Sequence, residues 1–213
     1  MSSLEEATQI LEGVPYKAVH LEDNAFDIGA YTQWANQIDE DLICALNSSS
    51  EPLCSQWLQK LWVNLNLPNV GIVGASGSYE SLSGLDPCFP EFPNIHLRST
   101  GFLIRRDLFC RLTKDYPLET KLDAYKCESG PDSLTQRILK EKLQVLVVGR
   151  NGRGYSPLYW RESDTFRQGT QTNLLIADGQ TRVFDKYVWA DRYTIMHNTF
   201  GDPSMKLVKN LGL

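Results

Sequence analysis

The stretch that decides the fold is "DLICALNSSSEPLCSQWLQKLWVNLNLPNVGIVGA", residues 41–75. It opens with a short apolar run at 42–46 and closes with a second one at 69–75, and each is typical of a buried strand. Ser50 is a candidate N-cap between the two runs, with Pro52 in the first helical turn. Apolar residues then recur at helical spacing: Leu53, Trp57, Leu58, Leu61, Trp62 and Leu65. The segment therefore predicts a strand, a helix and a strand.

The same alternation continues along the chain. Further strands are predicted in "FLIRR" (102–106), "QVLVVG" (144–149) and "NLLIADGQT" (173–181), with helices at 31–38, 129–143 and 182–197. Strand–helix alternation predicts a single α/β domain over 1–213, with a mainly parallel sheet flanked by helices. Two irregular segments, 76–97 and 149–172, resist assignment, and long loops in a compact domain are usually functional or disordered.

Composition narrows the function classes. The 213 residues carry 21 Lys and Arg against 26 Asp and Glu, a net charge of −5, so no basic surface for nucleic acid is expected. Five cysteines without a Cys-x-x-Cys pair predict reduced, mostly buried thiols rather than disulfides or zinc. The N-terminal "MSSLEEATQIL" has no signal-peptide pattern, and no apolar run reaches a membrane span of about 18 residues. A cytoplasmic location is therefore expected.

Polar residues stand at both ends of the first predicted strand. Asp39 and Asp41 have the Asp-x-Asp spacing that can hold a metal, but they precede the strand at 42–46. Ligands of open α/β sheets gather at the carboxyl ends of strands, where this chain has Asn47, Ser48 and Ser49. These neutral groups can hold hydroxyls or phosphate oxygens but bind divalent cations poorly. No cofactor is predicted, and Mn²⁺ or Mg²⁺ is disfavoured.

Four blocks carry a family resemblance: "LEDNAFDIGAYTQW" (21–34), "DLICALNSSSEPLCSQWLQKL" (41–61), "VGIVGASGSYES" (70–81) and "FPNIHLRSTGFLIRRDLF" (92–109). Their order resembles bacterial glycosyltransferases of the GT-A fold, of the rhamnan-synthesis and cell-surface polysaccharide type, over about residues 20–150. The resemblance implies a GT-A-like, sugar-nucleotide-dependent transferase that inverts configuration. Its ligands would be a nucleotide sugar and an acceptor, either a cell-envelope polysaccharide or a lipid-linked saccharide.

The chain departs from that pattern in two ways. Only about 20 residues precede the first block, so the strand–helix–strand unit that usually holds the nucleotide base is expected to be largely missing. Asn47, Ser48 and Ser49 replace the metal-binding acids. The alternative is a non-catalytic carbohydrate-binding or scaffold protein that keeps the acceptor half of the fold. An open sheet edge would invite pairing, so a homodimer is a further hypothesis.

Candidate donor-binding residues come from the first two blocks. By resemblance, Asn24 and Asp27 approach the donor, together with Asn47, Ser48 and Ser49. The alternative for Asp27 is a helix N-cap. His96 and Arg98 alternate on an extended segment and so face the same way, which suits a phosphate or a sugar hydroxyl. A histidine bonded to backbone in a packed loop is the alternative for His96.

The remaining candidates lie in the second half. The resemblance implies a carboxylate general base near the start of a late helix, for which we select Glu128, with Asp132 as the second choice and more typical of a helix-dipole role. The loop 149–160 offers guanidinium forks and aromatic faces for a sugar or a diphosphate: Arg150, Arg153, Tyr155 and Trp160. A solvated basic loop is the alternative. Rim positions are expected for Arg167, Gln171, Asn173 and Asp178.

Overall fold

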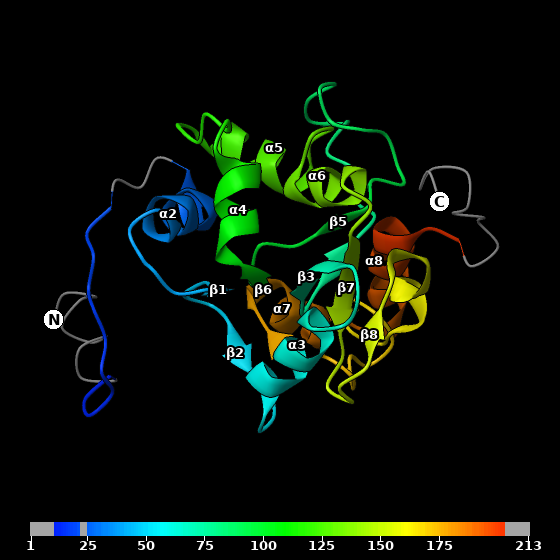
Figure 1. Ribbon diagram of the computed structural model, residues 1–213. Coiled ribbons are helices and arrows are strands. Elements are labelled where there is room, and N and C mark those ends of the chain that lie inside the picture. Colours follow the sequence, from blue (N-terminus) through cyan, green and yellow to red (C-terminus); the bar gives the residue numbers. More distant parts are fainter. Residues whose placement is uncertain (1–10, 22–24, 203–213) are drawn as a thin grey trace, which may run out of the picture.

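The computed structural model describes residues 11–21 and 25–202 and shows a five-stranded sheet covered by helices on both faces (Figure 1). The α/β class predicted from strand–helix alternation is confirmed. The strands lie in the order β1 (Leu42–Leu46), β6 (Gly101–Arg105), β3 (Val70–Gly74), β7 (Gln144–Val148) and β8 (Gly154–Tyr155).

The prediction of a mainly parallel sheet is wrong, because the sheet is mixed. Only β3 and β7 pair in parallel, whereas β6 runs antiparallel to both β1 and β3. The path of the chain explains this direction. After β3 the backbone stays at the end of the sheet where this strand finishes, and Ala75 N–H donates there to the carbonyl of Gly101 at 2.9 Å. Because β6 starts at the same end, it runs in the opposite direction to β3.

Alternating side chains of the central strands fill two separate cores. Phe102 and Ile104 of β6 face a cluster covered by α2 (Phe26–Ala35), α4 (Arg106–Thr113), α5 (Lys121–Ser129) and α6 (Leu134–Lys140). Leu103, between them, faces the opposite cluster beneath α3 (Trp57–Leu65). A strand with apolar residues on both faces reads as a continuous apolar run, which explains the pattern of "GFLIR".

The predicted start of the helix that follows β1, at Ser50, is wrong. Helix α3 begins at Trp57, and Glu51–Pro52 instead form β2, which pairs with β9 (Ile176–Ala177). The Ser50 hydroxyl is not an N-cap, because it donates to the carbonyl of Thr100. A contact across half the chain therefore uses the group that local sequence would assign to helix capping.

The C-terminal third also differs from prediction. The strand expected over 173–181 is limited to β9, and the expected closing helix is two helices, α7 (Gly179–Lys186) and α8 (Trp189–Phe200). Asp178 ends the strand segment and caps α7, because its side chain accepts from the backbone N–H of Thr181 at 2.8 Å. This capping box fixes the side chain of Asp178, which also pairs with Arg98.

The two irregular segments contain short strands. β4 (Gly77–Ser78) pairs with β5 (His96–Leu97), and the loop after β8 forms the 3₁₀ helix η1 (Pro157–Glu162). Trp160 of η1 is 1% exposed and stacks on Tyr79, with ring centroids 6.1 Å apart. A Cβ atom at Gly77 would lie 2.5 Å from the Trp160 ring, so only glycine fits beneath the indole.

Gly77→Ala is therefore expected to lower the free energy of unfolding by about 1–3 kcal/mol, because Trp160 must shift in a packed core. Urea denaturation would measure the change. Gly84→Ala is the matched control, since a Cβ there meets nothing within 4 Å. An equal effect of the two substitutions would contradict the packing argument.

Strand β1 leaves one edge of the sheet open. Within residues 11–21 and 25–202, β1 pairs only with β6, and Cys44 in its centre is exposed. An open edge presents backbone N–H and C=O groups that can pair with another strand.

Two expectations from composition can also be compared with the structure. All five cysteines are free thiols, but the expectation that most are buried is wrong: Cys44 and Cys88 are exposed and only Cys127 is fully buried. In the described ranges, no helix combines the length and the apolar character needed to cross a membrane.

Candidate functional site

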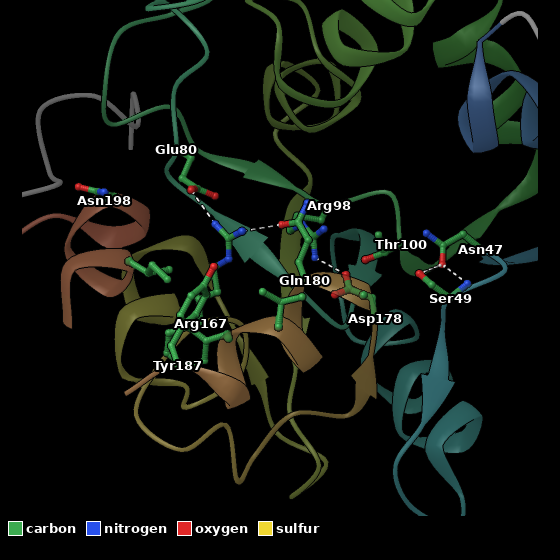
Figure 2. Close-up of a pocket in the computed structure, with 14 residues that line it drawn as sticks. Asn47, Ser49, Glu80, Arg98, Thr100, Arg167, Asp178, Gln180, Tyr187 and Asn198 are labelled. Carbon is green, nitrogen blue, oxygen red and sulfur yellow. Dashed lines mark hydrogen bonds and ion pairs between the residues drawn. The ribbon is translucent and has the colours of Figure 1, made fainter. Parts of the chain in front are cut away.

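The candidate site lies where β1 and β3 end and β6 begins. A cavity of about 550 Å³ opens there beside α7 and α8 (Figure 2). We name it the larger cavity because it exceeds the second cavity of this site. Its polar lining comes from six chain segments: Asn47, Ser49, Glu80, Arg98, Thr100, Arg167, Asp178, Gln180 and Asn198. Asn47 thus lines a cavity at the carboxyl end of β1, where the strand-end rule places ligands.

A second cavity of about 240 Å³, the smaller cavity, lies between α2 and α5. Asp27 lines it from α2 and Glu128 from α5. Both cavities are lined by Arg98, Thr100 and Gln180, so the two adjoin at these residues. Together they form one groove that passes from α2 to α8.

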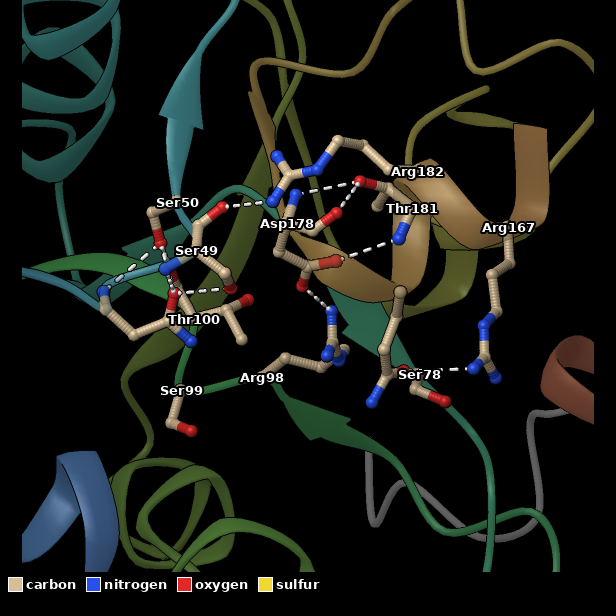
Figure 3. A network of polar contacts seen from close by, with 12 residues as sticks. Ser49, Ser50, Ser78, Arg98, Ser99, Thr100, Arg167, Asp178, Thr181 and Arg182 are labelled. Carbon is tan, nitrogen blue, oxygen red and sulfur yellow. Dashed lines mark hydrogen bonds and ion pairs between the residues drawn. The ribbon is translucent and has the colours of Figure 1, made fainter. Parts of the chain in front are cut away.

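A buried ion pair between Arg98 and Asp178 forms the floor of this groove (Figure 3). Only 7% of the Arg98 side chain and 3% of the Asp178 side chain is exposed. Burial by itself would raise the pKa of the Asp178 carboxyl, but the Arg98 charge and the Thr181 N–H outweigh it and hold the pKa below its usual range. Asp178 is therefore ionised at neutral pH, and its charge offsets that of Arg98.

Arg167 is the second arginine of the larger cavity and also has a carboxylate partner. Its guanidinium donates to Glu80 at 2.8 Å and to the Gln180 side chain at 2.9 Å. Arg98 and Arg167 both lie over the buried ring of Phe166, at 4.2 and 5.0 Å from its centroid. The cavity thus presents planar hydrogen-bonding groups without an excess positive charge.

The loop after β1 is held by hydrogen bonds within the loop and by two other segments. Asn47 Oδ1 accepts from the Ser49 N–H at 3.1 Å and from the Ser49 hydroxyl at 2.9 Å. Arg182 of α7 donates to the Ser49 carbonyl at 2.8 Å, and Ser50 bonds to the Thr100 carbonyl (Figure 3). These bonds fix the loop against the start of β6 and against α7.

This donor set does not fit a divalent cation. Asn47 and Ser49 supply only neutral oxygens, and the amide oxygen of Asn47 already accepts three hydrogen bonds. The carboxylates of the larger cavity, Glu80 and Asp178, are each paired with an arginine. Among the described residues, no group of three or more His, Cys, Asp or Glu side chains could hold a metal ion.

Glu128 is held in place by the loop that precedes β6. Its Oε2 accepts from the Ser99 N–H at 2.7 Å and from the Ser99 hydroxyl. No described residue donates to Oε1 of the same carboxylate, and Glu128 lines the smaller cavity. One carboxylate oxygen is thus fixed, while the other is available to a ligand hydroxyl.

His96 lies beneath the groove and does not line either cavity. It is 6% exposed, and Nδ1 contacts the Asn94 carbonyl at 2.8 Å, which matches the packed-loop alternative. Burial lowers the pKa of His96 from its ordinary value of 6.5, and Arg98 acts in the same direction against the carboxylates of Glu128 and Glu80.

Burial keeps His96 neutral in the folded chain, whereas in the unfolded chain His96 has its ordinary pKa of 6.5. Below this pH the unfolded chain therefore binds more protons than the folded chain. The free energy of unfolding is expected to fall as pH drops through this value toward the lower folded pKa, by up to about 1.4 kcal/mol per pH unit. His96→Asn should remove this slope, whereas His197→Gln, at an exposed position, should keep it. Urea denaturation between about pH 7.5 and pH 5.5 measures both. An unchanged slope in His96→Asn would assign the pH dependence to other groups.

Several expected residues lie away from the groove. Asp132 is bound to Arg137 and Lys140 on the surface, and it lines neither cavity. The hairpin of β7 and β8 carries Arg150, Arg153 and Tyr155 apart from both cavities, with Arg153 Cζ 5.2 Å from the Tyr155 ring centroid.

Trp160, Ser48 and Asp41 also lie outside both cavities. Trp160 is buried in the core, where its indole N–H donates to the Tyr155 carbonyl at 2.9 Å, so it offers no face to a ligand. Ser48 is exposed outside the cavity lining, and Asn24 lies outside the described residues. Asp27 is in the first turn of α2 but is not its N-cap, which is Ala25. Asp41 lies at the opposite end of β1, where its carbonyl accepts from Arg106 N–H.

Some lining residues were not expected from sequence. Glu80, Thr100 and Gln180 belong to this group in the larger cavity, and Phe26 and Tyr125 in the smaller one. A signal for Tyr125 exists, because Lys121, Tyr125 and Glu128 recur at helical spacing and therefore share one face of α5. Of the expected rim residues, Arg167 and Asp178 line the larger cavity.

Comparisons with known proteins add no relative to this picture. No protein-family model matches the chain, and no curated protein or solved structure matches it.

Proposed function

We propose that this chain is a cytoplasmic, sugar-nucleotide-dependent glycosyltransferase with a GT-A-like fold. The observation that carries the proposal is the convergence of five expected residues on one groove: Asp27, Asn47, Ser49, Arg98 and Glu128. They come from four separate segments, and the strand-end rule alone would not bring α2 and α5 to the same place. By the family resemblance, the acceptor is a cell-envelope polysaccharide or a lipid-linked saccharide.

We assign Glu128 as the base of an inverting displacement, supported by its place in the groove. Its carboxylate would take the proton of the acceptor hydroxyl as that oxygen attacks the anomeric carbon of the donor sugar. The bond from this carbon to the nucleoside diphosphate breaks in the same step. Ser99 orients the carboxylate by binding Oε2, and Oε1 is left for the acceptor hydroxyl.

A second candidate function is supported by the charges of the larger cavity. Arg98 and Arg167 are each neutralised by a carboxylate, so no described residue that lines the cavity is an unpaired cation for a diphosphate. Planar amide, carboxylate and guanidinium groups also suit neutral sugar hydroxyls. The second candidate is a non-catalytic carbohydrate-binding or scaffold protein.

A thermal-shift series with UDP, GDP, dTDP and CMP and their common sugar conjugates separates the two functions. The transferase predicts that one nucleotide sugar raises the unfolding midpoint without manganese. Saturation at about 100 times the dissociation constant adds roughly 2.7 kcal/mol of stability. The absence of a shift with every nucleotide, in folded protein that binds a saccharide, would support the second candidate. A shift that requires manganese would contradict the metal-free site.

We further propose that two copies of the chain pair through the open edge of β1. The support is the unpaired edge itself, since the backbone of the five-residue strand β1 pairs only with β6 in the described part of the chain and can accept a partner strand. Light scattering at increasing concentration is expected to show a dimer, and Cys44→Lys on the edge strand should weaken it. A monomer at the highest concentration would contradict the pairing.

A further inference from the structure

The mouth of the smaller cavity carries two aromatic side chains that do not enter the core. Phe26 is 44% exposed and Tyr125 is 39% exposed, and both line the cavity together with Glu128. Their ring centroids are 6.5 Å apart and the planes meet at 30°. The two rings therefore form a continuous, tilted apolar surface, which we name the aromatic platform.

The backbone holds Phe26 in an unfavourable conformation. Its φ angle is +50°, in the left-handed region that bulky side chains rarely adopt. Such conformations cost free energy and persist where the surrounding structure imposes them. At Phe26 burial offsets this cost only in part, since 44% of the residue is exposed.

A cation lies over both rings. Lys121 Nζ is 4.7 Å from the centroid of Phe26 and 5.8 Å from that of Tyr125. In the described part of the chain, Lys121 has no carboxylate partner. Ring faces that attract an ammonium also attract the weakly positive C–H groups of a sugar ring, which would displace Lys121 from them.

The other side of the cavity is polar. Asp27, Ser99 and Glu128 line it, and the Glu128 oxygen Oε1 accepts no hydrogen bond from the described residues. An apolar surface that faces a few convergent polar groups is the usual arrangement of a small-molecule site. A pyranose ring has both properties, with C–H groups on one face and hydroxyls at its rim.

Size and charge restrict the ligand. A volume of about 240 Å³ is below the roughly 300–1,000 Å³ of sites for drug-sized ligands, which favours one sugar ring. Asp27 and Glu128 supply two negative charges against one from Lys121, while Arg98 is paired with Asp178. An acidic sugar would be repelled, so the ring should be neutral.

We propose that the smaller cavity binds one neutral pyranose ring of the saccharide acceptor, stacked on the aromatic platform of Phe26 and Tyr125 with a hydroxyl at Glu128. The assignment of this ring as the acceptor rests on the proposed function. Asp27 then belongs to the acceptor side of the groove, because it shares the cavity of Glu128 rather than that of Asn47.

Saturation-transfer NMR tests the proposal directly. The probes are methyl α-rhamnopyranoside, methyl β-glucopyranoside, methyl β-galactopyranoside and methyl β-glucuronide, titrated into the wild-type chain. At least one neutral glycoside should bind, with strongest transfer to the C–H groups of one ring face. Phe26→Ala and Tyr125→Ala should each weaken this binding about tenfold. Tyr125→Phe should keep it, and so should Tyr159→Ala, which removes a 58% exposed ring outside the cavity.

The outcomes separate this proposal from the proposed function. Unchanged neutral-glycoside binding in folded Phe26→Ala and Tyr125→Ala overturns the platform, and so does binding of the glucuronide alone. A stabilising nucleotide sugar without any glycoside binding also overturns it and leaves the transferase standing. Platform-dependent glycoside binding without nucleotide binding supports the platform and rejects the transferase.

Discussion

Asp178→Asn is expected to lower the free energy of unfolding by about 3–5 kcal/mol, since it leaves the buried charge of Arg98 without a partner. Asparagine is an equally good N-cap, so the substitution preserves the start of α7 and isolates the loss of charge. Urea denaturation with both unfolding midpoint and slope would measure the change. The same variant should lose ligand binding in the larger cavity, because Arg98 is no longer held on the groove floor.

Glu141→Gln is the matched control, because it breaks an ion pair at the surface instead of a buried one. Its ion pair with Arg111 is partly exposed, and such pairs contribute about 0–1 kcal/mol. The double variant Arg98→Met with Asp178→Asn should recover much of the stability, because replacing both buried partners is often close to neutral. A cost of Asp178→Asn no larger than that of Glu141→Gln would show that the buried pair does not hold the site together.

Glu128→Gln is expected to reduce kcat for sugar transfer by about 10²–10⁴-fold, the contribution typical of a general base. The amide preserves the shape of the side chain but cannot take the acceptor proton. The KM for the nucleotide sugar should change little, because Glu128 lines the smaller cavity only. Steady-state transfer to a saccharide acceptor measures both constants.

Asp132→Asn provides the control in the same region of the chain. This carboxylate is 52% exposed and bound to Arg137 and Lys140, so its loss should change kcat less than twofold, within the scatter of surface substitutions. If Asp132→Asn removes activity while Glu128→Gln retains it, the assignment of the base is reversed.

Four of the five strands in the main sheet follow from the apolar runs of the sequence. β1, β3, β6 and β7 each lie within a residue or two of the predicted run, because strands buried on both faces leave a continuous apolar signature. The direction of β6 could not be predicted in this way, since apolar patterning carries no information on strand polarity. It depends on where the segment 76–97 returns the chain to the sheet.

The candidate site was predictable where it depends on strand ends. Asn47 and Arg98 lie where β1 ends and β6 begins, so the order of strands and loops was enough. Trp160 shows the limit of the same reasoning, because the sequence of a polar loop does not distinguish an aromatic residue that binds a ligand from one that fills the core. Trp160 packs in the core because Gly77, far away in sequence, leaves space for its ring. Lining residues such as Gln180 depend on where α7 begins, and the sequence pattern predicts a strand over 173–181 that includes this residue.

The ion pair on the groove floor has a consequence for the order in which the chain becomes functional during synthesis. All strands of the main sheet and of the two small sheets are complete at Ala177, yet the residue that neutralises Arg98 is the next one. A ribosome-bound chain that exposes only residues 1–177 would thus have its sheets but not its groove. Limited proteolysis of stalled chains should show the link between β5 and β6, residues 98–100, becoming resistant only after α7 has emerged.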